Sequence, residues 1–295
     1  MRYSKPPLTF EQQAALLISR GLIANRAALV RSLQAVGYYR LCAYWHPFKN
    51  SDDTFKPGTT LEIVWDRYVL DRKLRLLVMD AIERVEIAVR AQLVSRLTLA
   101  HGPFAHLNPR ALPDRYPGQL EEFIQRVRDD AGKSREVFVA HFKRKYDEFP
   151  DLPLWAASEI MTLGGLLTLF RMAGPKTHKE LAKPLGLGGP VLDSWIFTLN
   201  YVRNMCAHHS RLLNRTLAIK PLIPYPKHDP SWHVGGTIDN SRVFAVLTLL
   251  AYLLDRVAPG SGWKGRVKQL FDEHPGVPDS IVGCPAGWRD HPLWR

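Results

Sequence analysis

The sequence predicts an all-α protein. Apolar residues recur at the three- and four-residue spacing of amphipathic helices along most of the 295 residues. The alternation of apolar and polar residues that marks a half-buried strand is almost absent. With 46% apolar residues the chain can bury a sizeable core. We expect a single all-α domain over residues 1–295, with an N-terminal helical extension over 1–58, a helical core over 59–216 and a C-terminal wrap with helices over 217–295.

Two helices are expected before residue 40. Thr9 followed by Gln12 is a capping-box pattern, and it predicts a first helix over residues 9–20. A second helix is expected near residues 25–36. Beyond Gly37, the aromatic run YYRLCAYWHPF leads into the polar, Gly- and Pro-containing loop NSDDTFKPGTT.

A long helix is expected to follow this loop. Thr59 with Glu62 is a second capping-box pattern, which predicts the start of the helix there and an end near residue 100. Its buried stripe is expected to contain Leu61, Val64, Trp65, Tyr68, Leu74, Leu77, Val78, Ala81, Ile82, Val85 and Val89.

Charged residues occupy the other side of the long helix, with each acid four residues before its base, the favourable order for helix pairs. The pairs are Asp71 with Arg75, Asp80 with Arg84 and Glu86 with Arg90. The simplest interpretation is a solvated face with surface salt bridges.

The second half of the chain predicts further helices, separated by segments rich in Pro and Gly. After a connection over 102–118, Gly164 and Gly165 within the third of these helices favour close helix packing. The expected helices are 119–131, 134–147, 154–173, about 190–216 and a last apolar helix at 240–257. Between the last two, IKPLIPYPKHDPSWHVGGT is expected to wrap the surface without forming a helix.

The charge of the chain favours a polyanionic partner. Its 40 Lys and Arg residues against 28 Asp and Glu residues leave a formal charge of +12, which suits nucleic acid or an anionic membrane surface. No stretch approaches the roughly 18 to 20 uninterrupted apolar residues of a membrane span. The N-terminus lacks the apolar core of a signal peptide. We therefore expect a cytoplasmic protein that does not enter a membrane.

The three cysteines predict neither a disulfide framework nor a zinc site. Cys42, Cys206 and Cys284 are odd in number, widely separated and without CxxC spacing, so all three are expected to be reduced. A nucleophilic role for Cys206 is conceivable. A free cysteine is more often a small buried hydrophobe.

The helix expected over residues 195–215 carries the candidate site. At 100° per residue, one polar stripe within about 40° of Asn204 contains Asn200, Asn204, His208, Arg211 and Arg215. Arg203 and Asn214 flank one edge of this stripe. His209 falls on the opposite, apolar face, which predicts a packed histidine with a role different from that of His208.

The surroundings of His208 favour chemistry on a phosphodiester without a metal ion. No Asp or Glu occurs between Ser194 and His228, whereas two-metal chemistry needs carboxylates to hold the ions. We therefore expect neither a metal nor another cofactor. A histidine that moves protons near neutral pH and arginines that hold a phosphate suffice for transesterification of RNA by its own 2′-hydroxyl.

Two other interpretations of the polar stripe remain open. It can be a hydrogen-bond network between helices, or a face that binds phosphate without catalysis. Arg-x4-His is also a weak motif by itself, because Arg96 and His101 match it at the end of the long helix. The sequence does not decide whether this second match arises by chance.

The segment RNMCAHHSRLLNR, residues 203–215, resembles the RN-x-x-AH-x-x-R-x-x-N signature of the HEPN ribonucleases, in the form found in Abi-like (AbiD/AbiF-type) abortive-infection proteins. Several other segments resemble the same family in order and spacing, so the resemblance covers nearly the whole chain. They are KPPLTFEQQAALLISRGL, VGYYRLCAYWHPF, LDRKLRLLVMDAIERVEIAVR, LPLWAASEIMTLGGLLTLF and CPAGWRDHPLW.

The resemblance implies an all-α HEPN-type bundle, with additional N- and C-terminal helices, that forms a homodimer with a composite active site. It also implies metal-independent RNA cleavage that leaves a 2′,3′-cyclic phosphate. Arg203 would bind the scissile phosphate, Asn204 would orient the site and His208 would be the general base or acid. The other matched residues would hold RNA or support the site: Arg211, Asn214, Glu86 and Arg90. We expect the same of Arg215 from its place in the polar stripe.

The resemblance further implies phage defence or a toxin restrained by an antitoxin, in some relatives a small structured RNA. HEPN toxins silenced by a nucleotidyltransferase antitoxin carry a tyrosine two residues after the motif histidine. This chain has Ser210 there, which disfavours that regulation. Two alternatives to an endoribonuclease remain: a non-catalytic RNA-binding protein on the same fold, and a helical interaction module whose polar stripe only mediates dimerisation.

Overall fold

The computed structural model describes residues 6–113, 116–235 and 238–295. Within these ranges the chain forms α-helices joined by loops and short 3-10 turns, and pairing between extended segments is limited to three isolated bridges. The predicted all-α class is confirmed. The helices are α1 (Phe10–Ser19), α2 (Arg26–Val36), α3 (Tyr38–Trp45), α4 (Leu61–His101), α5 (Gln119–Lys133), α6 (Val137–Lys145), α7 (Leu154–Ile160), α8 (Leu163–Met172), α9 (Gly174–Ala182), α10 (Gly189–Ala207), α11 (Val243–Val257) and α12 (Trp263–Asp272).

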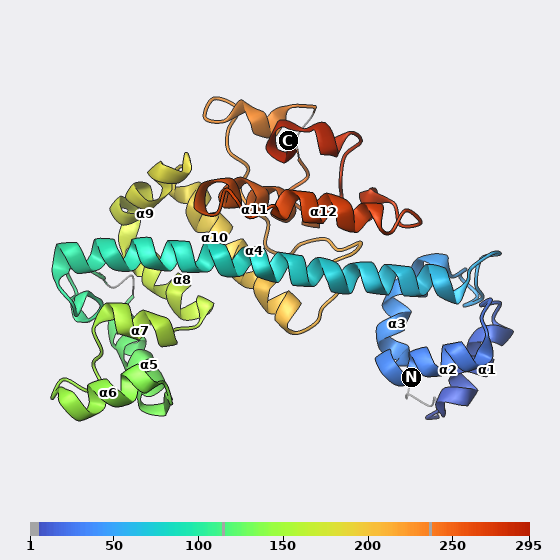
Figure 1. Cartoon of the computed structure of the whole chain (residues 1–295), viewed down its shortest axis with the longest axis horizontal. Helices are drawn as coiled ribbons and strands as arrows, with labels where there is room; N and C mark the ends of the chain where they lie inside the picture. The colour runs from blue at the N-terminus through green and yellow to red at the C-terminus, as the bar shows by residue number, and fades with distance from the viewer. Residues whose placement is uncertain (1–5, 114–115, 236–237) are drawn as a thin grey trace.

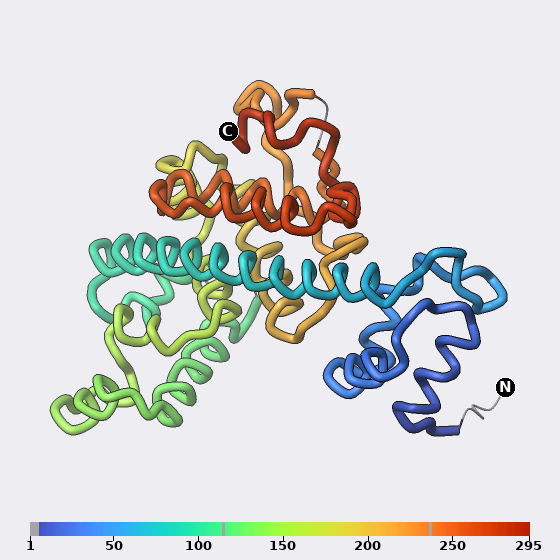
Figure 2. The backbone as a smooth tube through the Cα atoms, turned by 45° about the vertical axis from the view of Figure 1, so that its right-hand side comes forward, coloured from blue at the N-terminus to red at the C-terminus, as the bar shows by residue number. Residues whose placement is uncertain are grey.

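The long helix α4 is the axis of the molecule. Its 41 residues span about 60 Å at 1.5 Å per residue. Figure 1 shows α1–α3 at one end of α4, α5–α9 at the other end, and α11 and α12 packed along its length. Figure 2 confirms from a second direction that α1–α3 and α5–α7 lie at opposite ends. The predicted apolar stripe is buried along this axis, with Trp65, Tyr68 and Leu77 partly exposed.

Two hydrophobic cores share this axis. The smaller one, which we call the N-terminal lobe, is formed by α1–α3, the following loop and the first turns of α4, and ends at Val64. The larger one begins at Leu70 and continues to Trp294 near the C-terminus. α4 therefore joins the lobe to the rest of the protein through one continuous helix.

The capping residues of α1 and α4 test the two predicted helix starts. At α1 the capping box is present, because Gln12 N donates to Thr9 Oγ1 at 3.2 Å and Thr9 N donates to Gln12 Oε1 at 2.9 Å. At α4 the predicted capping residue is wrong by one position. Thr60 is the N-cap and accepts from Ile63 N at 3.3 Å, while Thr59 is buried and donates to Lys56 O.

Several helices differ from the sequence prediction. The aromatic run after Gly37 forms α3, and α9 and α12 are also additional helices, so the helix at 243–257 is not the last. The helix expected over 154–173 is two helices, because Thr162 caps α8 by accepting from Gly165 N at 3.1 Å. Gly164 and Gly165 therefore lie in the first turn of α8 and do not mark a close helix crossing.

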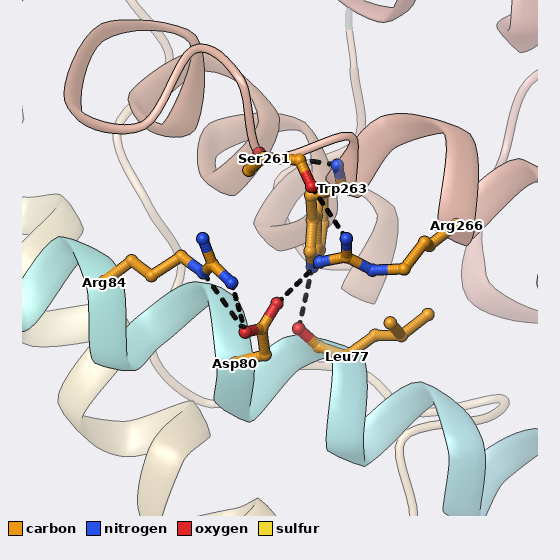
Figure 3. A network of polar contacts seen from close by, with 6 residues as sticks. All are labelled: Leu77, Asp80, Arg84, Ser261, Trp263 and Arg266. Atoms are coloured by element: carbon orange, nitrogen blue, oxygen red, sulfur yellow. Dashed lines mark hydrogen bonds and ion pairs between the residues drawn. The ribbon is translucent and has the colours of Figure 1, made fainter.

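α12 is fixed to α4 by polar contacts around an aromatic side chain. Trp263 Nε1 donates to Leu77 O at 2.8 Å, and Arg266 Nη2 lies 2.8 Å from Asp80 Oδ2 (Figure 3). Arg84 holds the other oxygen of Asp80 at 3.0 Å. No helix in the described ranges combines the length and the hydropathy that crossing a bilayer requires.

Candidate functional site

The helix that carries the candidate site ends earlier than the sequence predicts. α10 stops at Ala207, and His208 is its C-cap. His209 N donates to Cys206 O at 3.0 Å and Ser210 N donates to Met205 O at 2.8 Å, the bond pair of a Schellman motif. Residues 208–215, which we call the motif loop, are thus not helical, and the predicted helical stripe does not extend to Arg211 and Arg215.

The backbone of the motif loop is strained at two positions. His209 has φ 57° and Asn214 has φ 49°, both in the left-handed region. This region costs a residue with a side chain about 1–2 kcal/mol, although His and Asn enter it more readily than most. Such a conformation persists where the surrounding structure holds it in place.

Asp71 of α4 holds the middle of the motif loop. Its Oδ1 accepts hydrogen bonds from Leu212 N at 2.8 Å and Leu213 N at 2.9 Å. Its Oδ2 accepts from Tyr44 Oη of α3 at 2.7 Å and from Arg75 Nη1. The carboxylate is fully buried. The interpretation of Asp71 and Arg75 as a solvated surface pair is therefore wrong, because this pair faces the motif loop and not water.

Burial also perturbs the phenol that completes this cluster. The pKa of Tyr44 is raised, first by burial and then by the negative charge of Asp71 and the hydrogen bond to it. Tyr44 therefore stays protonated and keeps donating to Asp71 at any pH the protein meets in a cell. The acceptor atoms of Asp71 are thus occupied by permanent donors.

Three further contacts fix the two ends of the motif loop. Arg40 Nη1 of α3 donates to His209 O at 2.8 Å, and Arg211 Nη1 donates to Ala43 O, also of α3. Near the loop's end, Asn214 N donates to Ile281 O at 2.7 Å. The loop is therefore held by the N-terminal lobe, by α4 and by the C-terminal region.

The residues expected to act in catalysis lie at the end of α10. Arg203 and Asn204 are on its last turn, where Arg203 Nη1 donates to Asn204 Oδ1 at 3.3 Å. Asn204 and His208 are exposed, and Arg203 is partly exposed. His209 is exposed as well, so the prediction of a packed histidine is wrong. The left-handed turn takes residue 209 out of the helical register and away from the apolar face.

Glu86 and Arg90 of α4 bring a second element to the site. Arg90 Nη2 lies 2.6 Å from Glu86 Oε1, and both side chains are mostly buried. Burial raises the pKa of Glu86, and the positive charges of Arg90 and Arg203 oppose that rise. Glu86 is therefore within electrostatic range of Arg203. Although α10 has no acidic residue from Ser194 on, α4 places a carboxylate beside it.

The supporting residues of the motif loop have individual surroundings. The Arg211 guanidinium donates to the carbonyl oxygen of Ala43, so this side chain holds the loop against α3. Asn214 is exposed at its left-handed position, and Arg215 is partly buried. These three residues lie beyond the end of α10, so they approach the site as loop residues.

The second Arg-x4-His match lacks these features. Arg96 and His101 lie within the continuous helix α4, and not on a loop that other segments hold. Arg96 Nη1 is 3.7 Å from Glu180 Oε2, which partly neutralises it. His101 is the last residue of α4, and the positive φ of 85° after it belongs to Gly102, so no residue with a side chain is held in that conformation there.

Cys206 is a buried hydrophobe of α10. Its side chain is 4% exposed, and burial raises the pKa of the thiol to about 12. The thiol is therefore protonated at neutral pH and a poor nucleophile. In the described part of the chain, no three His, Cys, Asp or Glu side chains are grouped so that they could hold a metal ion.

The fold and the site together define an all-α protein with one Arg-x4-His motif at a tethered helix end. The family model described as Abi-like protein matches residues 31–214, from α2 through the motif loop and therefore more than half of the chain. The protein belongs to this family of Abi-like abortive-infection proteins. Neither a curated protein nor a solved structure matches the chain.

Proposed function

We propose that this protein is a metal-independent endoribonuclease that acts in abortive infection. The observation that carries the proposal is the placement of His208. It is exposed at the C-terminus of α10, four residues after Asn204 and five after Arg203, and it opens a loop whose strained backbone is held by three remote segments. A rigid loop that presents a titratable side chain to solvent is typical of a functional site.

The chemistry that suits these residues is attack by the 2′-hydroxyl of RNA on the adjacent phosphate. His208 as general base takes the proton of the 2′-hydroxyl while the 2′-oxygen forms a bond to phosphorus. The bond from phosphorus to the 5′-oxygen breaks, and an acid returns a proton to that leaving oxygen. Arg203 stabilises the charge on the phosphate, and Asn204 orients Arg203. The products of the reaction are a 2′,3′-cyclic phosphate and a 5′-hydroxyl.

A homodimer with a composite site fits the helix geometry. Arg203 and His208 are five residues apart, about 140° around α10, and so point to different sides of one helix end. Two copies of α10 that meet at a phosphate can supply Arg203 from one and His208 from the other. The HEPN ribonucleases that the sequence resembles imply this arrangement.

A ribonuclease of this kind needs a restraint in an uninfected cell. We propose a toxin held inactive by an antitoxin, for which a small structured RNA suits the formal charge of +12. In that arrangement the substrate and the inhibitor are both polyanions that bind the cationic surface around the motif loop.

The alternative is a non-catalytic RNA-binding protein on the same fold. It uses the same cations but needs no proton transfer by His208. It predicts no cleavage, and an affinity for RNA whose logarithm falls as the logarithm of the salt concentration rises.

The deciding experiment incubates the dimer-sized fraction of the full-length protein with total RNA in EDTA. We expect cleavage by the wild type and a loss of about 10²–10⁴-fold in His208→Ala, the usual contribution of a general acid or base. Arg203→Ala should also be inactive. His101→Ala is the matched control, because it removes the exposed histidine of the second Arg-x4-His match. Equal cleavage by wild type and His208→Ala, or intact RNA with tight binding in both, would reject the enzyme.

A further inference from the structure

Two stretches of the chain without acidic residues meet at the motif loop. One runs from Ser194 to His228, and the other runs from Gln12 to Ser51, through α2 and α3. Contacts join them directly, since Arg40 Nη1 donates to His209 O at 2.8 Å and Arg211 Nη1 donates to Ala43 O. The surface beside His208 therefore continues onto α2 and α3, which carry Arg26, Arg31 and Arg40 and no acidic residue. Arg20 and Lys49 of the same stretch are paired with Asp53.

This lobe carries the most exposed aromatic side chain among the described residues. Tyr39 on α3 is 91% exposed, whereas its neighbour Tyr38 packs against Trp45 with ring centroids 5.1 Å apart. Tyr39 directly precedes Arg40, so its Cα lies about 3.8 Å along the chain from a residue bonded to the motif loop. An exposed aromatic ring contributes little to the stability of the folded protein, because it buries little apolar surface. It is suited to stack on a flat partner.

We propose that the α3 face of the N-terminal lobe binds single-stranded RNA beside the motif loop, with Tyr39 stacked on an unpaired base. This inference rests on the proposed function and identifies the substrate as unpaired RNA. Positive charge binds phosphates but does not distinguish a single strand from a duplex, whereas an aromatic ring stacks on bases that are free of a duplex. The combination selects a single strand.

The same contacts explain why the lobe suits this role. The lobe has its own core, which ends at Val64, and it reaches the motif loop through Arg40, through Ala43 and, with Tyr44, through Asp71. The N-terminal lobe is therefore held next to the motif loop by several hydrogen bonds.

The test measures the binding of full-length protein in the His208→Ala background, so that RNA is not consumed. The probes are a fluorescein-labelled single strand of about twelve mixed-sequence nucleotides and the same sequence as a duplex. We expect Tyr39→Ala to bind the single strand about tenfold more weakly, Tyr39→Phe to retain the affinity, and the duplex to be unaffected by either change. Because Tyr39 is exposed, neither variant should change the unfolding midpoint.

Tyr116→Ala is the matched control. Tyr116 is 51% exposed, and its Oη donates to Glu122 of α5 at 3.3 Å. α5 lies at the end of α4 opposite the N-terminal lobe (Figure 1). We expect this variant to bind both probes as the parent does.

The outcomes separate the two levels of the proposal. If the parent binds the single strand and Tyr39→Ala binds it equally well, the stacking site is wrong while the ribonuclease proposal stands. Equal weakening by Tyr39→Phe, or weakening of duplex and single strand alike, also rejects stacking. A change in oligomeric state with unchanged affinity would assign Tyr39 to a protein interface and reject the inference. If the parent binds no RNA, the proposed function fails and the inference fails with it.

Discussion

The carboxylate of Asp71 accepts a hydrogen bond from the backbone nitrogen of Leu212 at 2.8 Å across 141 residues of sequence. Asp71 lies in the first third of α4, and Leu212 lies four residues after the candidate catalytic histidine. The same oxygen also accepts from Leu213 N. Because these bonds fix the backbone that follows His208, the long helix sets the position of the site as well as supporting the core.

Asp71→Ala should destabilise the protein by about 3–5 kcal/mol, because it leaves Arg75 buried without its partner and two buried amides without an acceptor. Asp80→Ala is the matched control on the same helix with the same spacing to an arginine. Its side chain is 36% exposed and it has two exposed partners, Arg84 and Arg266, so the loss of both surface pairs should cost only about 1–2 kcal/mol. Urea unfolding measures both, and equal losses would contradict the buried role of Asp71.

His209→Gly should be more stable than His209→Val by about 1–2 kcal/mol, because only glycine enters the left-handed region without strain. The carbonyl that Arg40 binds is present in both variants. His209→Gly should also keep RNA cleavage, since we assign the proton transfer to His208. Thermal unfolding and a cleavage assay check the two parts. A folded but inactive His209→Gly protein would show that the ring of His209 takes part.

The sequence predicts the helices whose ends have clear chemical markers. The Thr9 and Gln12 capping box gives α1, and apolar periodicity gives α4 and α11 with nearly correct bounds. The end of α10 is missed because the left-handed residue that stops it is a histidine and not the usual glycine. α3 is missed because its eight aromatic-rich residues are too short for a periodic pattern.

The candidate site shows a similar limit. The motif identifies Arg203, Asn204 and His208, but it says nothing of the segments that hold them. Asp71 has the same spacing to an arginine as the exposed pair at Asp80, so the pair pattern cannot distinguish them. The available signal is that Asp71 stands three and seven residues before Leu74 and Val78, in line with the buried stripe.

Glu86→Gln should lower RNA cleavage about tenfold, equivalent to about 1.4 kcal/mol in the barrier. The reason is that Glu86 is paired with Arg90 and interacts electrostatically with Arg203, and so helps to orient the phosphate-binding arginine. Glu83→Gln, on the exposed side of α4 nearby, is the control and should cleave normally. Single-turnover rates with saturating protein measure this step. Unchanged rates in Glu86→Gln would remove Glu86 from the site.

His106 should make the protein sensitive to mild acid. Burial lowers its pKa to about 4, against a smaller opposing effect of Asp151. The unfolded chain binds a proton near pH 6.5, so stability present above that pH is lost progressively as the pH falls toward 4. At pH 5 this amounts to about 2 kcal/mol. Between pH 7 and pH 5, the free energy of unfolding should fall by about 2 kcal/mol less in His106→Leu than in the wild type. Equal losses would contradict the prediction.

The most direct test of the account identifies the ends of the products by mass spectrometry. A defined single-stranded RNA is incubated in EDTA with wild type and with His208→Ala. The account predicts that wild type leaves 5′ fragments with a 2′,3′-cyclic phosphate and 3′ fragments with a 5′-hydroxyl, and that His208→Ala leaves the RNA intact. Fragments with a 3′-hydroxyl and a 5′-phosphate, or the same products in the same yield from His208→Ala, would contradict it.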